Sequence, residues 1–480
     1  MNFAKYIPTR LRNAINELES HSVKVFIVGG YCRDIVMEAV PKDIDLVVES
    51  DKSDAELIHI LHRYGEVVDS KSLGKNFGVF VWKVGDKAYE VARTRTEHGN
   101  GSMKDAEVFT VGVSIMDDLN RRDITMNAIA YRVNENYIID PHNGIEHIQK
   151  RYIKPISSAF QNSIERPLRV ARMACKFEKS YIDHWLYEMM VSMKSNTGWG
   201  MTHDQANALG LAAIPKDQIW AQWEKMCQED YPGMFLGVMN KIEWLDFMPE
   251  LAHLKNIPQD PEWHPEGKVL NHIICVMNAT AVIAKRHGLG KTETVILVTA
   301  AACHDIGKAS STKINKNGRI VSPGHDRIGV PLAENFLKSM GAPNGIIKLV
   351  LELVKLHMFH VSRYQQKPAA AARWILSEMR YNSPIMLMLL IEADYSGRPP
   401  KLPGLPDSAR NIFDECQKQN WEFIPIVTGK FLIKHFGNIV KPGKEMGRLI
   451  EVGRNAQIRG TIHNENSAIS VMKSALKTIA

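Results

Sequence analysis

Two aspartates separated by a single residue are the first candidates for chemistry in this 480-residue chain. Asp43 and Asp45 lie in KDIDLVV, whose β-branched residues predict a strand. Side chains at positions i and i+2 lie on the same face of a strand, so the two carboxylates should point the same way. Paired carboxylates bind Mg²⁺, which keeps phosphate oxygens among its ligands. The spacing therefore indicates two-metal catalysis on a phosphate substrate.

A glycine pair lies upstream of these aspartates, in VGGYCRD. Gly29 and Gly30 would allow the backbone to approach a triphosphate closely. Either motif alone is weak evidence, because Asp-x-Asp is common on solvated strand edges and the dinucleotide pattern GxGxxG is absent. Their order and spacing together favour a nucleotide-binding site.

A third motif, DLNRRDITMNAIA, places two adjacent arginines at the polar start of an apolar segment, followed by Asp123 and Asn127. Paired guanidinium groups suit a clamp on a triphosphate. The alternative is a capped helix with solvated arginines, and that interpretation would be preferred if the motif stood alone.

The second half of the chain carries histidines and aspartates of the kind that bind divalent metals: His264, His272, His304, Asp305, His325, His357, His360 and Asp394. An isolated His-Asp pair is usually structural. Several such residues in one helical region favour a site where a metal activates water against a phosphoester. The alternative is a folded relic with solvated histidines.

The elements that must position these residues change type along the chain. The first 150 residues alternate strand and helix signals, with a hairpin predicted around Gly85-Asp86, and from about Ser163 the apolar spacing is helical. We therefore expect an α/β N-terminal domain followed by all-α domains. Proline-rich segments at 259–267 and 398–408 mark boundaries. The expected domains are residues 1–150, 151–258, 259–398 and 399–480.

Composition limits the choice of partner and compartment. The net charge of +7 suits a polyanionic partner without naming one. The six cysteines occur singly with no CxxC pair, which predicts neither a zinc ribbon nor disulfides and favours a reducing, cytoplasmic location. No run of about 18 apolar residues is present, so we expect no membrane span.

Taken in order, GG…RD…DIDLVV, ARTR, RRDITMNA and ERPLRVARMACKF resemble the class II tRNA nucleotidyltransferases. These CCA-adding enzymes share a polymerase-β-like fold with bacterial poly(A) polymerases. The HPEG and HDIGK segments and the VTGKFL tail extend the resemblance to the bacterial, multifunctional subgroup with a C-terminal HD domain. The resemblance implies addition of CCA to tRNA 3′ ends from CTP and ATP with Mg²⁺, and it implies no protein partner.

The family resemblance also implies roles for individual residues. Asp43 and Asp45 would hold Mg²⁺ and act as the catalytic pair. Glu90 is a candidate third carboxylate, although a solvated strand glutamate is about as plausible. The residues implied in nucleotide binding are Gly29, Gly30, Arg33, Arg93, Arg121, Asp123, Asn127, Arg169 and Arg172.

In the HD subgroup, His272, His304, Asp305 and Asp394 would bind one divalent metal of unknown identity. His325 and His357 are candidates for a second ion. The implied reaction is hydrolysis of phosphoesters, including 2′,3′-cyclic phosphates, by phosphodiesterase and phosphatase steps. Such steps would repair a tRNA end that lacks the free 3′-hydroxyl needed for extension.

One residue departs from the family pattern. An aspartate normally follows the glutamate of the base-selecting motif, but here Arg166 follows Glu165. The family aspartate accepts from the exocyclic amine of C or A, and arginine has no acceptor. We therefore expect weaker selection of C and A, unless Glu165 or another acceptor replaces it.

The C-terminal region is basic, and the resemblance makes a tRNA backbone contact its expected role. Its basic residues are Lys441, Lys444, Arg448, Arg454 and Arg459. Two other functions remain open. One is a poly(A)-type RNA tailing enzyme, and the other is an HD phosphohydrolase whose front domain only binds RNA or nucleotide.

Overall fold

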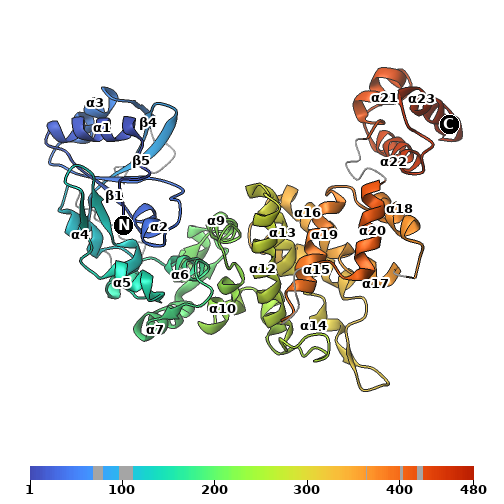
Figure 1. Ribbon diagram of the computed structural model, residues 1–480, viewed down its shortest axis with the longest axis horizontal. Coiled ribbons are helices and arrows are strands. Elements are labelled where there is room, and N and C mark those ends of the chain that lie inside the picture. Colours follow the sequence, from blue (N-terminus) through green and yellow to red (C-terminus); the bar gives the residue numbers. More distant parts are fainter. Residues whose placement is uncertain (69–78, 97–111, 364, 400–403, 419–424, 480) are drawn as a thin grey trace. The chain divides into compact units, whose positions relative to one another are not determined.

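The chain folds into two compact units (Figure 1). The first comprises Met1–Gln222 and Val238–Trp244, and the second comprises Trp223–Gly237 and Leu245–Ala480. The computed structural model describes residues 1–68, 79–96, 112–363, 365–399, 404–418 and 425–479.

A mixed seven-stranded sheet forms the core of the N-terminal part, in the order β3-β4-β5-β2-β1-β6-β7. The strands β2 and β5 run parallel, whereas the other neighbours are antiparallel. The hairpin predicted around Gly85-Asp86 is confirmed, because β4 and β5 pair on either side of it. The strands are β1 (Lys24–Val28), β2 (Asp45–Glu49), β3 (Glu66–Val68), β4 (Val79–Val84), β5 (Lys87–Arg93), β6 (Ala130–Arg132) and β7 (Tyr137–Ile139).

The register of the two central strands places the first candidate residues. The ladder between β1 and β2 ends at the pair Val28 and Asp45, because Gly29 then turns the chain with a φ of 63° into helix α2 (Gly30–Val36). A side chain other than glycine rarely adopts that φ. The prediction that Asp43 also lies on the strand is wrong, because β2 begins at Asp45, two residues after Asp43.

Helices surround the sheet and continue beyond it in the first unit. The helix α1 buries Leu11, Ala14, Ile15 and Leu18, spaced at the helical period. The helix α1 spans Thr9–Ser20, and short 3-10 turns lie at Thr125–Asn127 and Ser158–Asn162. The other helices are α3 (Asp54–His62), α4 (Ile115–Asn120), α5 (Gly144–Gln149), α6 (Arg166–Ala174), α7 (His184–Met193), α8 (His203–Ala208) and α9 (Lys216–Met226).

The second unit is built around α13 (Lys291–Cys303), which is apolar on every side and packs against α12, α16 and α19. A helix that is apolar all round has to lie inside a core. The elements in this part of the chain are α11 (Pro249–Ala252), α12 (Val269–Arg286), α14 (Lys308–Ser311), α15 (His325–Ser339), α16 (Asn344–Leu356), α17 (Phe359–Arg363), α18 (Pro368–Glu378), α19 (Pro384–Ser396) and the hairpin β12 (Lys313–Ile314) to β13 (Ile320–Val321). The helix α10 (Gly233–Lys241) has residues in both units.

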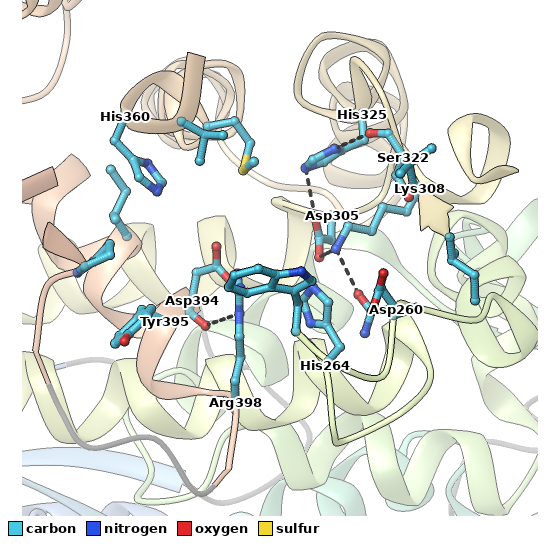
Figure 2. Close-up of a pocket in the computed structure, with 18 of the residues that line it drawn as sticks. Asp260, His264, Asp305, Lys308, Ser322, His325, His360, Asp394, Tyr395 and Arg398 are labelled. Atoms are coloured by element: carbon cyan, nitrogen blue, oxygen red, sulfur yellow. Dashed lines mark hydrogen bonds and ion pairs between the residues drawn. The ribbon is translucent and has the colours of Figure 1, made fainter. Parts of the chain in front are cut away.

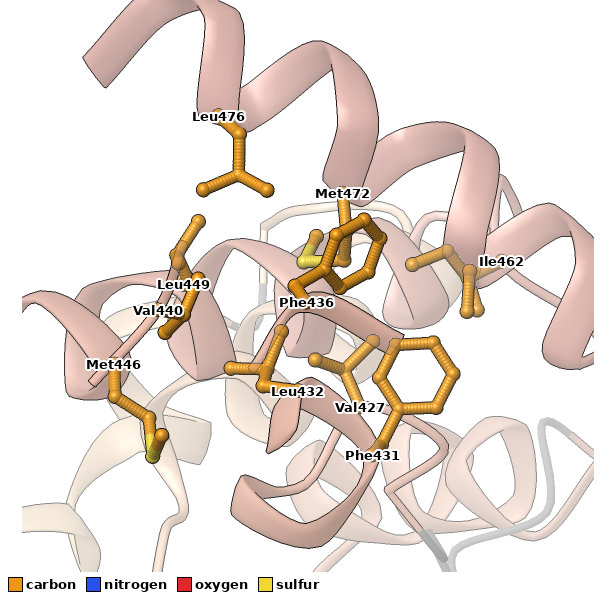
Figure 3. Packing of buried hydrophobic residues seen from close by; sticks show 11 residues of the cluster. Val427, Phe431, Leu432, Phe436, Val440, Met446, Leu449, Ile462, Met472 and Leu476 are labelled. Atoms are coloured by element: carbon orange, nitrogen blue, oxygen red, sulfur yellow. The ribbon is translucent and has the colours of Figure 1, made fainter. Parts of the chain in front are cut away.

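The last three helices, α21 (Gly429–Phe436), α22 (Lys444–Ile458) and α23 (Glu465–Ile479), enclose a small apolar core of their own (Figure 3). By contrast α20 (Asp407–Lys418), which lies C-terminal to the expected boundary at residue 398, packs against α18 and α19. After the seven-stranded sheet, the regular secondary structure of the described residues is helical apart from short two-stranded ladders. The predicted fold class is therefore confirmed.

The part of the chain that the structure describes contains no helix with the length and apolar content needed to cross a bilayer.

Candidate active sites

Carboxylates gather at the edge where β2 begins. Asp45 is half-buried and faces Glu90 across the parallel ladder of β2 and β5, while Asp43 lies exposed two residues earlier. Burial, then the charges of Glu90 and Asp43, raises the pKa of Asp45. Oxygen donors that repel one another in this way suit Mg²⁺, which would relieve the repulsion. The structure thus places Glu90, the candidate third carboxylate, beside Asp45 of the predicted pair.

The guanidinium of Arg122 lies against the glycine turn, although only Arg121 of the arginine pair was assigned a nucleotide-binding role from the sequence. A Cβ atom on Gly29 would lie 3.3 Å from Nη1 of Arg122, which donates to the carbonyl of Asn127 at 3.2 Å. From α2, Arg33 donates to the Asn127 side chain at 2.8 Å. Both arginines act to lower the pKa of Asp45, opposing its burial. Cations and the catalytic carboxylate therefore share one site, as a metal-triphosphate substrate requires.

A buried carboxylate fixes the two adjacent arginines. Asp118, on α4, bonds Arg121 at 2.7 Å and Arg122 at 2.9 Å, three and four residues later. Burial alone would raise the pKa of Asp118, but the two guanidiniums hold it below its usual range. The sequence contained a signal for this role of Asp118, because residues three and four positions apart lie on the same face of a helix and can form ion pairs.

A second buried carboxylate joins the sheet to α6. Asp123 accepts from Arg169 at 2.8 Å and from Asn127 at 3.0 Å, and Asn127 in turn accepts from Arg33. Burial opposes ionisation, yet Arg169 and Asn127 hold the pKa of Asp123 well below its usual range. Four of the predicted nucleotide-binding residues therefore form one continuous chain of hydrogen bonds.

Two further predicted residues have contacts elsewhere. Arg172 donates to the side chain of Gln222 on α9 at 3.0 Å. Arg93 is buried at the end of β5 and bonds Asp54 at 2.9 Å and the Ser50 carbonyl at 2.9 Å. Those contacts fasten β5 to the start of α3, and the nucleotide-binding role of Arg93 stays a prediction.

Arg166 is turned into the protein. Its side chain is 7% exposed and donates to the carbonyl of Ala159 at 2.6 Å and to that of Arg121 at 3.2 Å. These two hydrogen bonds fasten α6 to the segment before it and to the end of α4. The expectation of weaker selection of C and A stays a prediction, because Arg166 supplies no acceptor in the place of the family aspartate.

The second unit brings together every predicted HD residue. His272, from α12, lies 3.0 Å from Asp394 of α19, and its Nε2 lies 3.4 Å from Nε2 of His304 at the end of α13. The three can offer ligand atoms within 4.8 Å of one another, and a second such set is formed by Asp305, His325 and His357. Three of the four residues predicted for the first ion therefore group together, and the fourth, Asp305, groups with His325 and His357, the candidates for a second ion.

Backbone carbonyls fix the tautomer of these histidines. The Nδ1 atoms of His304, His325 and His357 each lie 2.7 Å from the carbonyl three residues earlier. A carbonyl only accepts, so each Nδ1 carries a proton, and in the neutral form of each ring the Nε2 atom presents a lone pair. The facing Nε2 atoms of His325 and His357 are 3.2 Å apart, an arrangement that a bound cation stabilises.

The charge state of the cluster also suits a metal. Burial would raise the pKa of Asp305 and Asp394, but His304 with Lys308 for the first, and Arg398 with His272 for the second, hold both well below the usual range. Burial, then the neighbouring His325, lowers the pKa of His357 well below its usual value. The two carboxylates and His357 are thus in the forms that bind metal, whereas, despite burial, Asp305 and Asp394 raise the pKa of His304, which a cation would have to oppose.

The cluster lies at one wall of a cavity of about 660 Å³ (Figure 2). Lys308 reaches Asp305 at 2.7 Å, and Arg398 reaches Asp394 at 2.5 Å. Figure 2 shows the two cations approaching from different elements, each against its own aspartate. Two fixed cations beside metal ligands are suited to a phosphoester.

Comparison with known proteins agrees with both sites. Residues 25–154 match the family model described as the poly A polymerase head domain, and residues 269–391 match the HD domain. The chain is 28% identical over 382 residues to the "Multifunctional CCA protein" of Aliivibrio salmonicida, covering 78% of this chain and 86% of that one. It is 27% identical over 383 residues to the protein of the same name from Tolumonas auensis, with 78% and 85% covered. The resemblance to class II tRNA nucleotidyltransferases with an HD domain is confirmed.

Solved structures share the fold at low sequence identity. The Bacillus stearothermophilus CCA-adding enzyme in complex with CTP aligns over 98% of this chain and 99% of its own, with a TM-score of 0.56 and 16% identity. The Thermotoga maritima CCA-adding enzyme complexed with tRNA aligns over 99% and 97%, with a TM-score of 0.52 and 14% identity. The order of a polymerase head and a helical body is therefore that of CCA-adding enzymes.

The crowded carboxylates predict a pH-dependent cost in stability. Because the folded state raises the pKa of Asp45, it binds a proton more readily than the unfolded state does, so stability falls as pH rises through that range. Asp45→Asn should remove this loss and raise the melting temperature of metal-free protein at neutral pH. Thermal unfolding across pH would test this, with exposed Asp51→Asn as the control. Equal melting temperatures for Asp45→Asn and wild type would contradict it.

Gly307 packs so closely against α15 that a larger residue there should displace His325, one of the three residues that could hold the second ion. A Cβ atom on Gly307 would collide with the carbonyl of His325 and with the amide of Gly329, both in α15. Gly307→Ala should cost about 1–3 kcal/mol of stability and weaken divalent-metal binding by displacing His325. Gly345→Ala is the control, because its Cβ would meet open space. Denaturant unfolding and metal titration measure both effects, and a Gly307→Ala protein that behaves like Gly345→Ala would refute the account.

Proposed function

We propose that this chain adds C, C and A to the 3′ end of tRNA, using CTP and ATP at the head site. The observation that carries the proposal is the meeting of Asp45, Glu90, Arg33 and Arg122 at the glycine turn. The curated relatives are named multifunctional CCA proteins, and related structures are described in complex with CTP, ATP and tRNA, which supports the choice of substrates.

In this reaction the terminal hydroxyl of the RNA attacks the α-phosphorus of the nucleotide. An O–P bond forms, and the bond to pyrophosphate breaks. Asp43 and Asp45, with Glu90 beside them, would hold Mg²⁺, which supplies a lowered hydroxyl pKa and neutralises the leaving pyrophosphate. Gly29 and Gly30 let the backbone approach the triphosphate. The fixed guanidiniums of Arg33, Arg121 and Arg122 would bind its oxygens.

Base selection belongs to α6 in this proposal. Asp123 orients Arg169 through its Nε, and the Arg169 side chain remains 41% exposed, which allows it to reach a base. Arg172 lies one turn further along the same helix, held by Gln222. A site that hydrogen-bonds the substrate base rejects bases that leave its buried groups unpaired.

The HD unit is proposed to hydrolyse phosphoesters at RNA ends. Water attacks the phosphorus of a 2′,3′-cyclic phosphate, and one P–O bond to the ribose breaks; a second hydrolysis releases phosphate and leaves the free hydroxyl. His272, His304, Asp305 and Asp394 would hold one divalent cation, with Asp305, His325 and His357 for a second. Cations held there would supply activation of water and neutralise phosphate charge.

The C-terminal helices are proposed to contact the tRNA backbone. Arg454 is bonded to the carbonyls of Leu376 and Met379 on and after α18, so it has a structural task. The remaining basic residues of the predicted surface are exposed: Lys441, Lys444, Arg448 and Arg459. We keep the division into head, neck, HD domain and tail as a proposal. The proposed cytoplasmic location agrees with six cysteines that form no disulfide.

Two separate sites predict two separable activities. Asp43→Ala or Asp45→Ala should lower nucleotide addition about a hundredfold or more and leave phosphohydrolase activity intact. Conversely, His304→Ala with Asp305→Ala should remove the phosphohydrolase activity and spare addition. The assays are extension of a tRNA lacking CCA, with each nucleoside triphosphate separately, and hydrolysis of a 2′,3′-cyclic nucleotide.

The same extension assay separates the alternatives. Incorporation of A without C would indicate a poly(A)-type tailing enzyme. Absence of any addition by wild-type protein, with hydrolysis present, would indicate a front domain that only binds. Loss of both activities in a folded Asp45→Ala protein would contradict two independent sites.

The contacts of Arg166 predict that it does not read the base. Arg166→Ala should lower stability by about 1–3 kcal/mol, because the carbonyls of Ala159 and Arg121 lose buried donors. The ratio of C and A addition to U and G addition should stay unchanged. Arg169→Ala is the matched comparison and should lower that ratio. A large change in selectivity for Arg166→Ala, measured with the four nucleotides on one tRNA, would show that Arg166 faces the base after all.

A further inference from the structure

The HD cavity is much larger than the phosphate that its metal ligands need. Its volume is about 660 Å³, within the roughly 300–1,000 Å³ that small-molecule sites occupy. Asp305, His325 and Asp394 form part of one wall. Beyond them the lining is mainly apolar: Trp263, Ile320, Val321, Pro323, Met358 and Val361. A phosphoester held at the metal end would therefore place an uncharged, mainly flat or apolar group in the rest of the cavity.

Trp263 is the largest apolar side chain in that lining, and 50% of it is exposed. It lies on a turn fixed by bonds from the amides of Trp263 and His264 to the Asp260 carbonyl, at 3.1 Å and 2.9 Å. Arg319 ties down the same turn by bonding Asp260 at 2.8 Å and Glu262 at 2.7 Å. These bonds fix the backbone of the turn that carries Trp263 at the cavity.

The turn is also fixed relative to the metal ligands. His264, next to Trp263, packs its ring against that of His272 with centroids 4.7 Å apart, and Glu266 bonds both imidazoles at 2.8 Å and 2.7 Å. The backbone that carries Trp263 is thus anchored to the cluster. A platform for a flat group has to be positioned in this way if the phosphate of the same molecule is to reach the metals.

We propose that Trp263 is a stacking platform for the base of a terminal nucleotide, so that the HD site acts on unpaired nucleotide ends. This inference rests on the proposed phosphohydrolase function and specifies its substrate class. Lys308 and Arg398 provide cations for the phosphate beside Asp305 and Asp394, and the cavity has room for one nucleoside. Every base has a π face, so stacking on an indole accepts all four bases. The base must be unpaired, because a base inside a duplex has both faces covered.

Steady-state hydrolysis by the full-length protein tests this assignment. The substrates are the four nucleoside 2′,3′-cyclic phosphates and ribose 2′,3′-cyclic phosphate, which lacks a base. Trp263→Ala and Trp263→Leu should raise KM for the nucleotides about 5- to 100-fold, the range expected for one lost base stack. The value of kcat and the hydrolysis of the base-free compound should change little. Trp263→Phe keeps an aromatic face and should stay near wild type.

Trp185→Ala is the matched control, since this tryptophan is 44% exposed and lies on α7 in the other unit. Calorimetric binding to metal-free protein gives a second readout that does not need turnover. Wild type should bind adenosine 2′,3′-cyclic phosphate more tightly than the base-free compound, and Trp263→Ala should abolish that difference.

The outcomes separate this inference from the proposed hydrolase function. Equal use of base-containing and base-free substrates by wild type, unaffected by Trp263→Ala, would overturn the platform and leave the hydrolase in place. Base-dependent binding that is lost in Trp263→Ala, without any hydrolysis, would support the platform and refute the hydrolase. Hydrolysis of a phosphopeptide in preference to every nucleotide would overturn both.

Discussion

A buried carboxylate has to be paired with a cation or a strong donor, and this constraint organises both units. Asp118 and Asp123 have no route to solvent, so their charges hold Arg121, Arg122 and Arg169 in place. Removing one partner of such a pair is costly because the other charge stays buried. The guanidiniums of these three arginines are therefore held in position without a bound nucleotide.

The HD unit applies the same constraint to metal ligands. Asp305 and Asp394 stay ionised because cations lie against them, Lys308 beside the first and Arg398 beside the second. Burial, then the neighbouring His325, lowers the pKa of His357, whereas, despite burial, Asp305 and Asp394 raise the pKa of His304. Backbone carbonyls hold the Nδ1 proton of His304 and of His357. The cluster therefore gathers carboxylate oxygens and imidazole Nε2 atoms in one place, which suits it to bind a cation.

The two proposed chemistries are complementary in what they consume and produce. Addition of a nucleotide needs a free hydroxyl at the RNA end, and a cyclic or phosphorylated end lacks it. Hydrolysis at the HD unit yields that hydroxyl, so its product is the substrate of the head site. Joining the two in one chain places both activities on the same RNA without requiring a contact between their active sites.

The sequence by itself determined the kinds of residue and the order of the elements. Strand and helix periods are local properties, so they were sufficient to predict the α/β head and the helical region. The HD ligand set was predicted from the order of its histidines and aspartates, which resembles that of the HD family. Only the tertiary structure placed Arg122 rather than Arg121 against Gly29, put Glu90 opposite Asp45, and buried Arg166 against the carbonyls of Ala159 and Arg121. Those contacts join residues from separate strands and helices. Their geometry follows from strand register and helix packing, and no spacing within one segment encodes either.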